Sequence, residues 1–143
     1  MSAERLYTPA MLAAAVELAN YPPLEIAQWH GSARSPACGS TLDIDLGLDD
    51  SGTIAKIGMK VRACAVGQAA AAVFARHAPG SDAAEIGSTL EALSAWLDHD
   101  APMPEWPDLA LIAPARDYRG RHGAMLLPWR AAVAALSTAA PAR

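Results

Sequence analysis

The two cysteines are the residues best suited to carry chemistry, because each lies beside a signal that would present its sulfur. Cys38 lies in the segment 35–40 (SPACGS), where proline and glycine predict a tight loop. Cys64 directly precedes a helical pattern, and the free N–H groups and positive dipole end of a helix start stabilise a thiolate, with Arg62 adding positive charge. A thiolate is both a nucleophile and a metal ligand, so we expect metal or sulfur chemistry here. Burial as a small hydrophobic side chain is the alternative for Cys38.

His122 is the histidine whose sequence neighbours differ from those of the other three. It follows Arg121, which would stabilise anionic sulfur, and precedes Gly123, which allows close approach of the backbone. Two thiolates and one imidazole form a three-ligand set that suits zinc with an open fourth position, or an iron–sulfur cluster that is held incompletely. The remaining histidines are expected to be solvated or hydrogen-bonded: His30, His77 and His99.

Composition and charge restrict the class of protein. The chain has 143 residues, of which 52% are hydrophobic and 18% charged, a balance that predicts one globular domain over residues 1–143. Its net charge of −4 does not attract nucleic acid, and no apolar run approaches the roughly 20 residues of a membrane span. The first residues match neither a secretory nor a transit signal. We therefore expect a cytoplasmic protein without a structural disulfide.

Alternating apolar and polar residues predict a small antiparallel sheet that would position the cysteines. The clearest alternation, over residues 40–48, puts these side chains on one face: Leu42, Ile44, Leu46 and Leu48. Turn residues at 49–52 and a second alternation over 53–62 predict a hairpin partner. A weaker alternation over 24–34 suits an edge strand. Cys38 and Cys64 flank the hairpin, so both can lie at one end of the sheet.

Helical periodicity and capping residues predict the elements around this sheet. Thr8 and Pro9 open a helix over about 9–19, and a period near 3.6 predicts a second helix from Cys64 to about His77.

The second half of the chain reads as mostly helical. Ser81 and Ser88 resemble caps of one or two further helices, and residues 109–112 suit a helical or an extended segment. Residues 116–139 look helical, with Pro128 either kinking the helix or starting its second half. We interpret three aromatic residues as core rather than interface: Trp29, Trp106 and Trp129. The predicted class is α+β, with an antiparallel sheet of about three strands and helices packed on one face.

The order of these motifs resembles the NifU-like N-terminal (IscU/SufU-type) iron–sulfur cluster scaffold family over roughly the whole chain. The resemblance rests on SPACGS before a strand, RACAVGQA before a helix, and RHGAML at 121–126. In that family one cysteine lies in a Cys-Gly-Asp motif, a second opens a helix rich in small residues, and a third starts the last long helix. The resemblance implies Cys38, Cys64 and His122 as ligands of a [2Fe–2S] cluster or iron, with zinc as the alternative.

Two positions depart from the family pattern. Ser40 stands in place of the aspartate that is implicated in cluster release, and Gly123 stands in place of the third cysteine, which commonly receives sulfur. The long connection from Cys64 to His122 is closer to the SufU type, which binds zinc and accepts persulfide sulfur. The residues expected to surround the ligands are Ser40, Arg62 and Arg121.

Three functions follow from this resemblance. The first is a scaffold that binds iron or a [2Fe–2S] cluster and passes it to acceptor apoproteins. The second is a zinc-binding sulfur acceptor for a cysteine desulfurase, and the third is a degenerate binding module without metal. In each case we expect a carrier, as monomer or homodimer, rather than an enzyme with catalytic residues.

Overall fold

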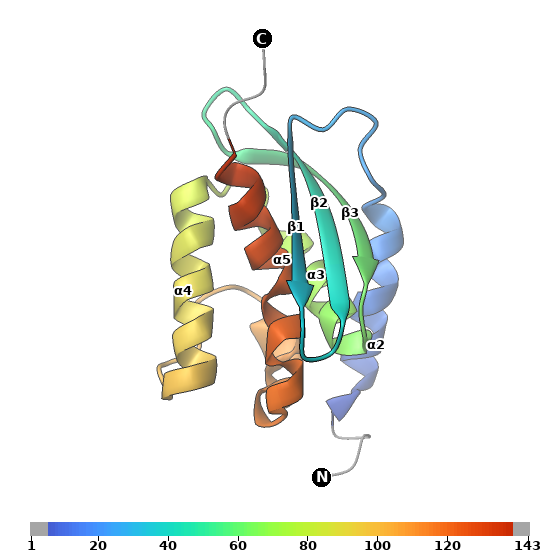
Figure 1. Cartoon of the computed structure of the whole chain (residues 1–143), viewed down its shortest axis with the longest axis vertical. Coiled ribbons are helices and arrows are strands. Elements are labelled where there is room, and N and C mark those ends of the chain that lie inside the picture. Colours follow the sequence, from blue (N-terminus) through green and yellow to red (C-terminus); the bar gives the residue numbers. More distant parts are fainter. Residues whose placement is uncertain (1–5, 139–143) are drawn as a thin grey trace.

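The computed structural model describes residues 6–138 and shows an antiparallel sheet with helices on one side of it (Figure 1). Within this range the sheet has the order β1-β2-β3, formed by Trp29–Ser35, Ser40–Leu48 and Ile54–Arg62. The longer helices are α2 (Pro9–Val16), α3 (Ala65–His77), α4 (Ala83–His99) and α5 (His122–Leu136). Short 3-10 helices connect them: η1 (Glu17–Asn20), η2 (Leu109–Leu111), η3 (Ala113–Asp117) and η4 (Arg119–Arg121). The predicted α+β class is confirmed.

Period-two alternation places the apolar side chains of the sheet on the face that the helices cover. Apolar cross-strand pairs line this face: Leu42 with Val61, Ile44 with Met59, and Leu46 with Ile57. Leu48 is half-buried against the core, as the alternation predicts, and the register shift at Gly47 and Leu48 leaves the extra residue in β3, at Ala55 between Ile54 and Lys56. Such a bulge interrupts the alternation at the end of a strand.

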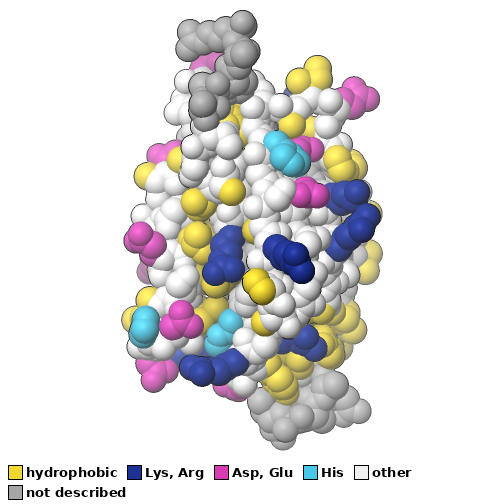
Figure 2. All heavy atoms as spheres, viewed as in Figure 1, with side chains coloured by type: hydrophobic (Ala, Val, Ile, Leu, Met, Phe, Trp, Pro, Cys, Tyr) yellow, Lys and Arg dark blue, Asp and Glu magenta, His cyan; other side chains and the backbone are white. Residues whose placement is uncertain are grey.

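The opposite face of the sheet is polar. Figure 2 shows basic, acidic and histidine side chains scattered over the side on which the strands are seen in Figure 1. On this face the ring Nδ1 of His30 lies 2.7 Å from an Asp45 carboxylate oxygen, and the Ser32 hydroxyl donates to Asp43. The sheet therefore has one buried face, and the helices gather on that side.

Helix α5 lies directly along β1. A side chain at Gly31 of β1 would overlap the α5 backbone at Ala131 and would come within 2.8 Å of the Cα of Ala135. Only a glycine permits this approach of helix to strand. Pro128 does not start a second half of α5, because one continuous helix runs through it from His122 to Leu136.

Aromatic rings form the centre of the core. Phe74 stacks on Trp106 with 5.7 Å between ring centroids, and Trp129 meets both rings edge-on. The indole N–H of Trp106 donates to the Val73 carbonyl at 3.1 Å. Trp106 and Trp129 are buried as predicted, whereas Trp29 is half-buried against the core.

Several element boundaries differ from the sequence-based expectation. The Thr8 hydroxyl caps α2 as predicted, by accepting from the Met11 N–H at 3.1 Å. Ser81 and Ser88 are not caps, because the Asp82 carboxylate caps one continuous α4 and Ser88 lies inside that helix. The Ser81 carbonyl instead accepts from the N–H of Ile54 in β3, which moves the helix start one residue later.

The segments at either end of the predicted C-terminal helix also differ. The region before His122 forms the 3-10 turns η3 and η4, so α5 starts later than expected, and Ala139 lies outside the described residues. Residues 109–112 adopt the helical alternative as η2, and β1 begins at Trp29 rather than at Leu24. Within residues 6–138 we find no helix with the length and apolar character that a membrane crossing needs.

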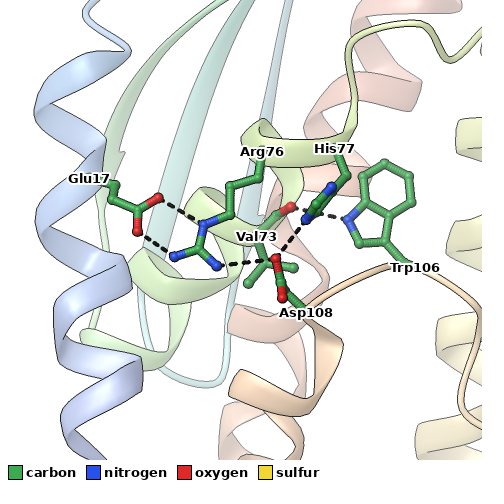
Figure 3. A network of polar contacts seen from close by, with 6 residues as sticks. All are labelled: Glu17, Val73, Arg76, His77, Trp106 and Asp108. Atoms are coloured by element: carbon green, nitrogen blue, oxygen red, sulfur yellow. Dashed lines mark hydrogen bonds and ion pairs between the residues drawn. The ribbon is translucent and has the colours of Figure 1, made fainter.

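A network centred on Arg76 ties the helical layer together (Figure 3). Arg76 donates to both carboxylate oxygens of Glu17 at the end of α2 and, at 3.2 Å, to Asp108 before η2. The His77 ring Nε2 lies 2.7 Å from the same Asp108 oxygen. The hydrogen bond from Arg76 lowers the pKa of Glu17, and the hydrogen bond with His77 is the main cause that lowers the pKa of Asp108. The positive charge of Arg76 is thus neutralised by the carboxylates of Glu17 and Asp108.

Candidate metal and sulfur site

The three segments that carry the predicted site residues meet at one end of the molecule (Figure 1). Thr41 pairs with Arg62, so the β1–β2 turn with Cys38 and the residues after β3 with Cys64 leave the sheet side by side. The start of α5 joins them, because a side chain on Gly123 would overlap the Ser35 hydroxyl at the end of β1.

Cys38 lies in the turn between β1 and β2, as predicted. Gly39 has a φ of 72°, a conformation that favours glycine, and its N–H donates to the Ser35 carbonyl at 2.8 Å. The half-buried Cys38 thiol donates to the hydroxyl oxygens of Ser35 and Ser40, at 3.3 and 3.2 Å, and in the thiolate form the same hydroxyls donate to the sulfur. Burial opposes the thiolate, but these hydrogen bonds and the charge of Arg121 outweigh it and lower the pKa of Cys38.

Cys64 occupies the N-cap position of α3, at the helix start predicted from the sequence. It is a half-buried free cysteine whose carbonyl accepts from the Gln68 N–H at 3.0 Å, so the helix ladder begins at Cys64. Gln68 also donates through its side chain to the Ala63 carbonyl at 2.9 Å, which fixes the backbone next to the cysteine. Arg62 is exposed. The sulfur of Cys64 is therefore held at the positive end of a helix.

Arg121 is the basic residue that directly precedes α5 at the end of the molecule where the cysteines lie. It ends η4 and donates to the Tyr7 hydroxyl at 3.3 Å. This hydrogen bond, followed by the attraction of the charges that Tyr7, Cys64 and Cys38 can carry, raises the pKa of Arg121. Within residues 6–138 it forms no ion pair with a carboxylate. The guanidinium charge also contributes to the lowered pKa of Cys38.

His122 begins α5 next to Arg121, and its ring is already engaged. Its Nε2 lies 2.6 Å from the Arg116 carbonyl, which can only accept, so Nε2–H donates and Nδ1 is the ring nitrogen left for a ligand bond. Among residues 6–138 no three side chains of the types His, Cys, Asp and Glu are grouped closely enough to hold a metal ion. The ligand set of Cys38, Cys64 and His122 therefore stays a prediction.

Known structures resemble this chain along nearly its whole length. A nitrogen-fixing NifU-like protein (N-terminal part) from Brucella abortus superposes with a TM-score of 0.84 at 29% identity, covering 94% of each chain. The resemblance to the NifU-like N-terminal family is confirmed. A candidate iron–sulfur cluster assembly scaffold of the SUF system from Fervidobacterium islandicum AW-1 shares the fold, with a TM-score of 0.81 at 17% identity over 95% of this chain and 100% of the other. No family model and no curated protein matches the sequence.

Two contributors to this end of the NifU-like fold were missed by the sequence analysis. Tyr7 binds Arg121, and the Ser35 hydroxyl contacts Cys38. Ser35 could have been noticed, because it lies three residues before Cys38 in the loop motif and ends a strand. No local signal identifies Tyr7, because its partner lies at the other end of the chain. Of the expected neighbours, Ser40 lies within hydrogen-bond distance of the Cys38 sulfur.

Proposed function

We propose that this protein carries iron or a [2Fe–2S] cluster during iron–sulfur cluster assembly, with Cys38 and Cys64 binding the cargo and His122 adding a ligand through Nδ1. The observation that carries this proposal is the meeting of the Cys38 turn, the Cys64 helix start and the first turn of α5 at one end of the molecule, where Arg121 contributes to the lowered pKa of Cys38. Soft thiolates select iron–sulfur clusters, iron and zinc among biological metals. A cluster bound by thiolates is anionic, and a nearby guanidinium offsets that charge.

The open character of the site supports release of the cargo. Cys38 and Cys64 are half-buried rather than enclosed, so a thiol of an acceptor protein can reach the metal. A cluster with fewer than four firm protein ligands exchanges more readily than one held by four cysteines. By this reasoning residues 1–143 act as one cytoplasmic carrier domain, which takes sulfur from a cysteine desulfurase and delivers the cluster to acceptor apoproteins.

A second candidate function is that of a zinc-binding sulfur acceptor, and the hydrogen bonds at Cys38 favour it. In this reaction the Cys38 thiolate attacks the terminal sulfur of a persulfide on the desulfurase, and the desulfurase cysteine leaves as a thiolate. The exchange needs no external oxidant or reductant. The Ser35 and Ser40 hydroxyls stabilise the attacking thiolate and the anionic persulfide that forms.

Metal and sulfide analysis separates these functions. Protein purified without oxygen is incubated with ferrous iron, cysteine and a desulfurase, and iron, zinc and acid-labile sulfide are measured. The carrier function predicts bound iron with matching sulfide, lost in Cys38→Ala and Cys64→Ala, reduced in His122→Ala and retained in the control Ser32→Ala on the outer face of β1. Zinc without sulfide, together with a persulfide on Cys38, would establish the acceptor. Neither metal would reject both.

A further inference from the structure

Ser35 and Gly123 are packed so closely that each restricts the other. Ser35 is 1% exposed at the end of β1, and Gly123 lies in the first turn of α5. A Cβ atom added at Gly123 would overlap the Ser35 hydroxyl and lie 2.9 Å from the Ser35 Cβ. Real Cβ atoms essentially never come that close to another carbon, so one of the two residues would have to shift.

Ser35 has little freedom to make room. Its carbonyl accepts the Gly39 N–H at 2.8 Å, and its backbone is paired with Ser40 across the hairpin. Its hydroxyl is engaged with the Cys38 sulfur at 3.3 Å. Moving the side chain would break this contact, and moving the backbone would open the turn that presents Cys38.

The overlap also shows where a side chain at position 123 would point. The atom in its path is the hydroxyl that contacts the Cys38 sulfur. A side chain at position 123 would therefore enter the site itself, and Ser35 fills that space instead.

We propose that Ser35 fills with its hydroxyl the space through which a side chain at position 123 would reach the cargo, so that position 123 supplies no ligand. A metal bound by Cys38 and Cys64 thereby keeps positions open for ligands from outside the chain. The identity of the cargo rests on the proposed function, whereas the exclusion of a third side chain does not.

The steric part is tested by a double-mutant cycle on thermal stability. Gly123→Ala introduces the overlapping Cβ, and we expect a fall in Tm of about 5 °C or more. Adding Ser35→Gly removes the obstructing atoms and should restore most of this loss, whereas adding Ser32→Gly on the outer face of the same strand should not. If Gly123→Ala melts with the wild type, or if both glycine substitutions rescue it equally, Ser35 does not exclude a side chain at 123.

The ligand part is tested with zinc as the probe, by competition with a chromophoric chelator under reducing conditions. Ser35→Gly combined with Gly123→Cys should bind zinc about ten-fold or more tightly than Ser35→Gly combined with Gly123→Ala, because a third thiolate is added. Gly123→Cys alone should show a lowered Tm and less than this gain. Equal zinc affinity of the two double variants would overturn the inference.

The two tests separate this inference from the proposed function. Loss of the steric coupling or of the zinc gain rejects the role of Ser35 whatever the wild type carries. Absence of iron and sulfide from the wild type, with the coupling and the zinc gain intact, rejects the cargo and leaves the role of Ser35 in place.

Discussion

Two arginines in different parts of the molecule have opposite surroundings. Arg76 lies between α2, α3 and η2 and is matched by the carboxylates of Glu17 and Asp108 (Figure 3). Arg121 lies at the cysteine end, where its hydrogen-bond partner among residues 6–138 is the neutral hydroxyl of Tyr7. Both side chains are permanently charged at physiological pH.

This difference separates a structural role from a binding role. The charge of Arg76 is neutralised within the fold, so its contribution is to hold helices together. Among residues 6–138 no carboxylate pairs with Arg121, so its charge is available to the Cys38 thiolate and to a bound anionic group. The comparison therefore predicts that substitutions around Arg76 lower stability, whereas substitution of Arg121 alters the chemistry of the cysteines.

The largest loss of stability is expected from substitution of Trp106, which lies next to the Arg76 network (Figure 3). Trp106→Ala removes the stacking on Phe74 and the hydrogen bond to Val73, and truncation of a buried tryptophan costs about 3–5 kcal/mol of unfolding free energy. Urea denaturation measures this change. Trp106→Phe keeps most of the packing and should lose less; equal losses would assign the effect to the hydrogen bond rather than to packing.

Arg76→Gln should have the next largest effect. It removes the ion pairs to two partly exposed carboxylates, so we expect a loss of about 1–2 kcal/mol after allowance for solvent screening. Arg130→Gln, at an exposed position of α5, is the matched control and should change little. Iron and sulfide loading at the cysteine end should stay unchanged in Arg76→Gln, and reduced loading of the folded variant would contradict the separation of roles.

Acid should weaken the Arg76 network. The pKa values of Glu17 and Asp108 are lowered in the folded state, so the stability that they contribute is present above their unfolded values and is lost as the pH falls through the folded ones. Urea denaturation between about pH 6 and about pH 3 should show falling stability in the wild type. The fall should be shallower in Arg76→Gln, where the His77 contact still acts on Asp108. An equal slope would place the acid sensitivity elsewhere.

Arg121→Gln is expected to have the smallest effect on stability, below about 0.5 kcal/mol. It should slow alkylation of Cys38 near neutral pH by roughly two- to three-fold, because the guanidinium is a minor cause of the lowered Cys38 pKa beside the hydroxyls of Ser35 and Ser40. Mass spectrometry of the Cys38 peptide after iodoacetamide treatment measures the rate. A slower rate in Arg130→Gln as well would indicate a general charge effect.

Local patterns in the sequence identified most of the fold. Residues 40–48 form β2 with the predicted bounds, because period-two alternation and flanking turn residues act within a short stretch. Thr8 and Cys64 occupy the predicted helix starts for the same reason. The sequence pattern assigned the N-cap of α4 to Ser81 instead of Asp82. The Ser81 carbonyl accepts a hydrogen bond from Ile54 of β3, and the residues next to Ser81 in the sequence do not reveal this contact.

The contacts that define the candidate site are long-range, and this limits what the sequence reveals about it. The partners of Arg121 at Tyr7, and of Gly123 at Ser35, depend on how α5 is placed against the sheet. The sequence alone does single out Cys38, Cys64 and His122, because of their side-chain chemistry and their flanking residues. Whether His122 joins the cysteines is a question of ring orientation, and the contact with the Arg116 carbonyl has no signature in the sequence.

Helix α5 packs along β1, and glycine permits a close approach near each end of the helix, at Gly31 and at Gly123. Because a helix moves largely as a rigid unit, its packing distance from β1 near Gly31 also affects the orientation of its N-terminal end near Gly123. Enlarging Gly31 would push the C-terminal half of α5 away from the sheet and tilt the first turn of the helix, which carries His122, relative to Cys38 and Cys64. The geometry around Cys38 and Cys64 therefore also depends on the packing of the opposite end of α5 against Gly31.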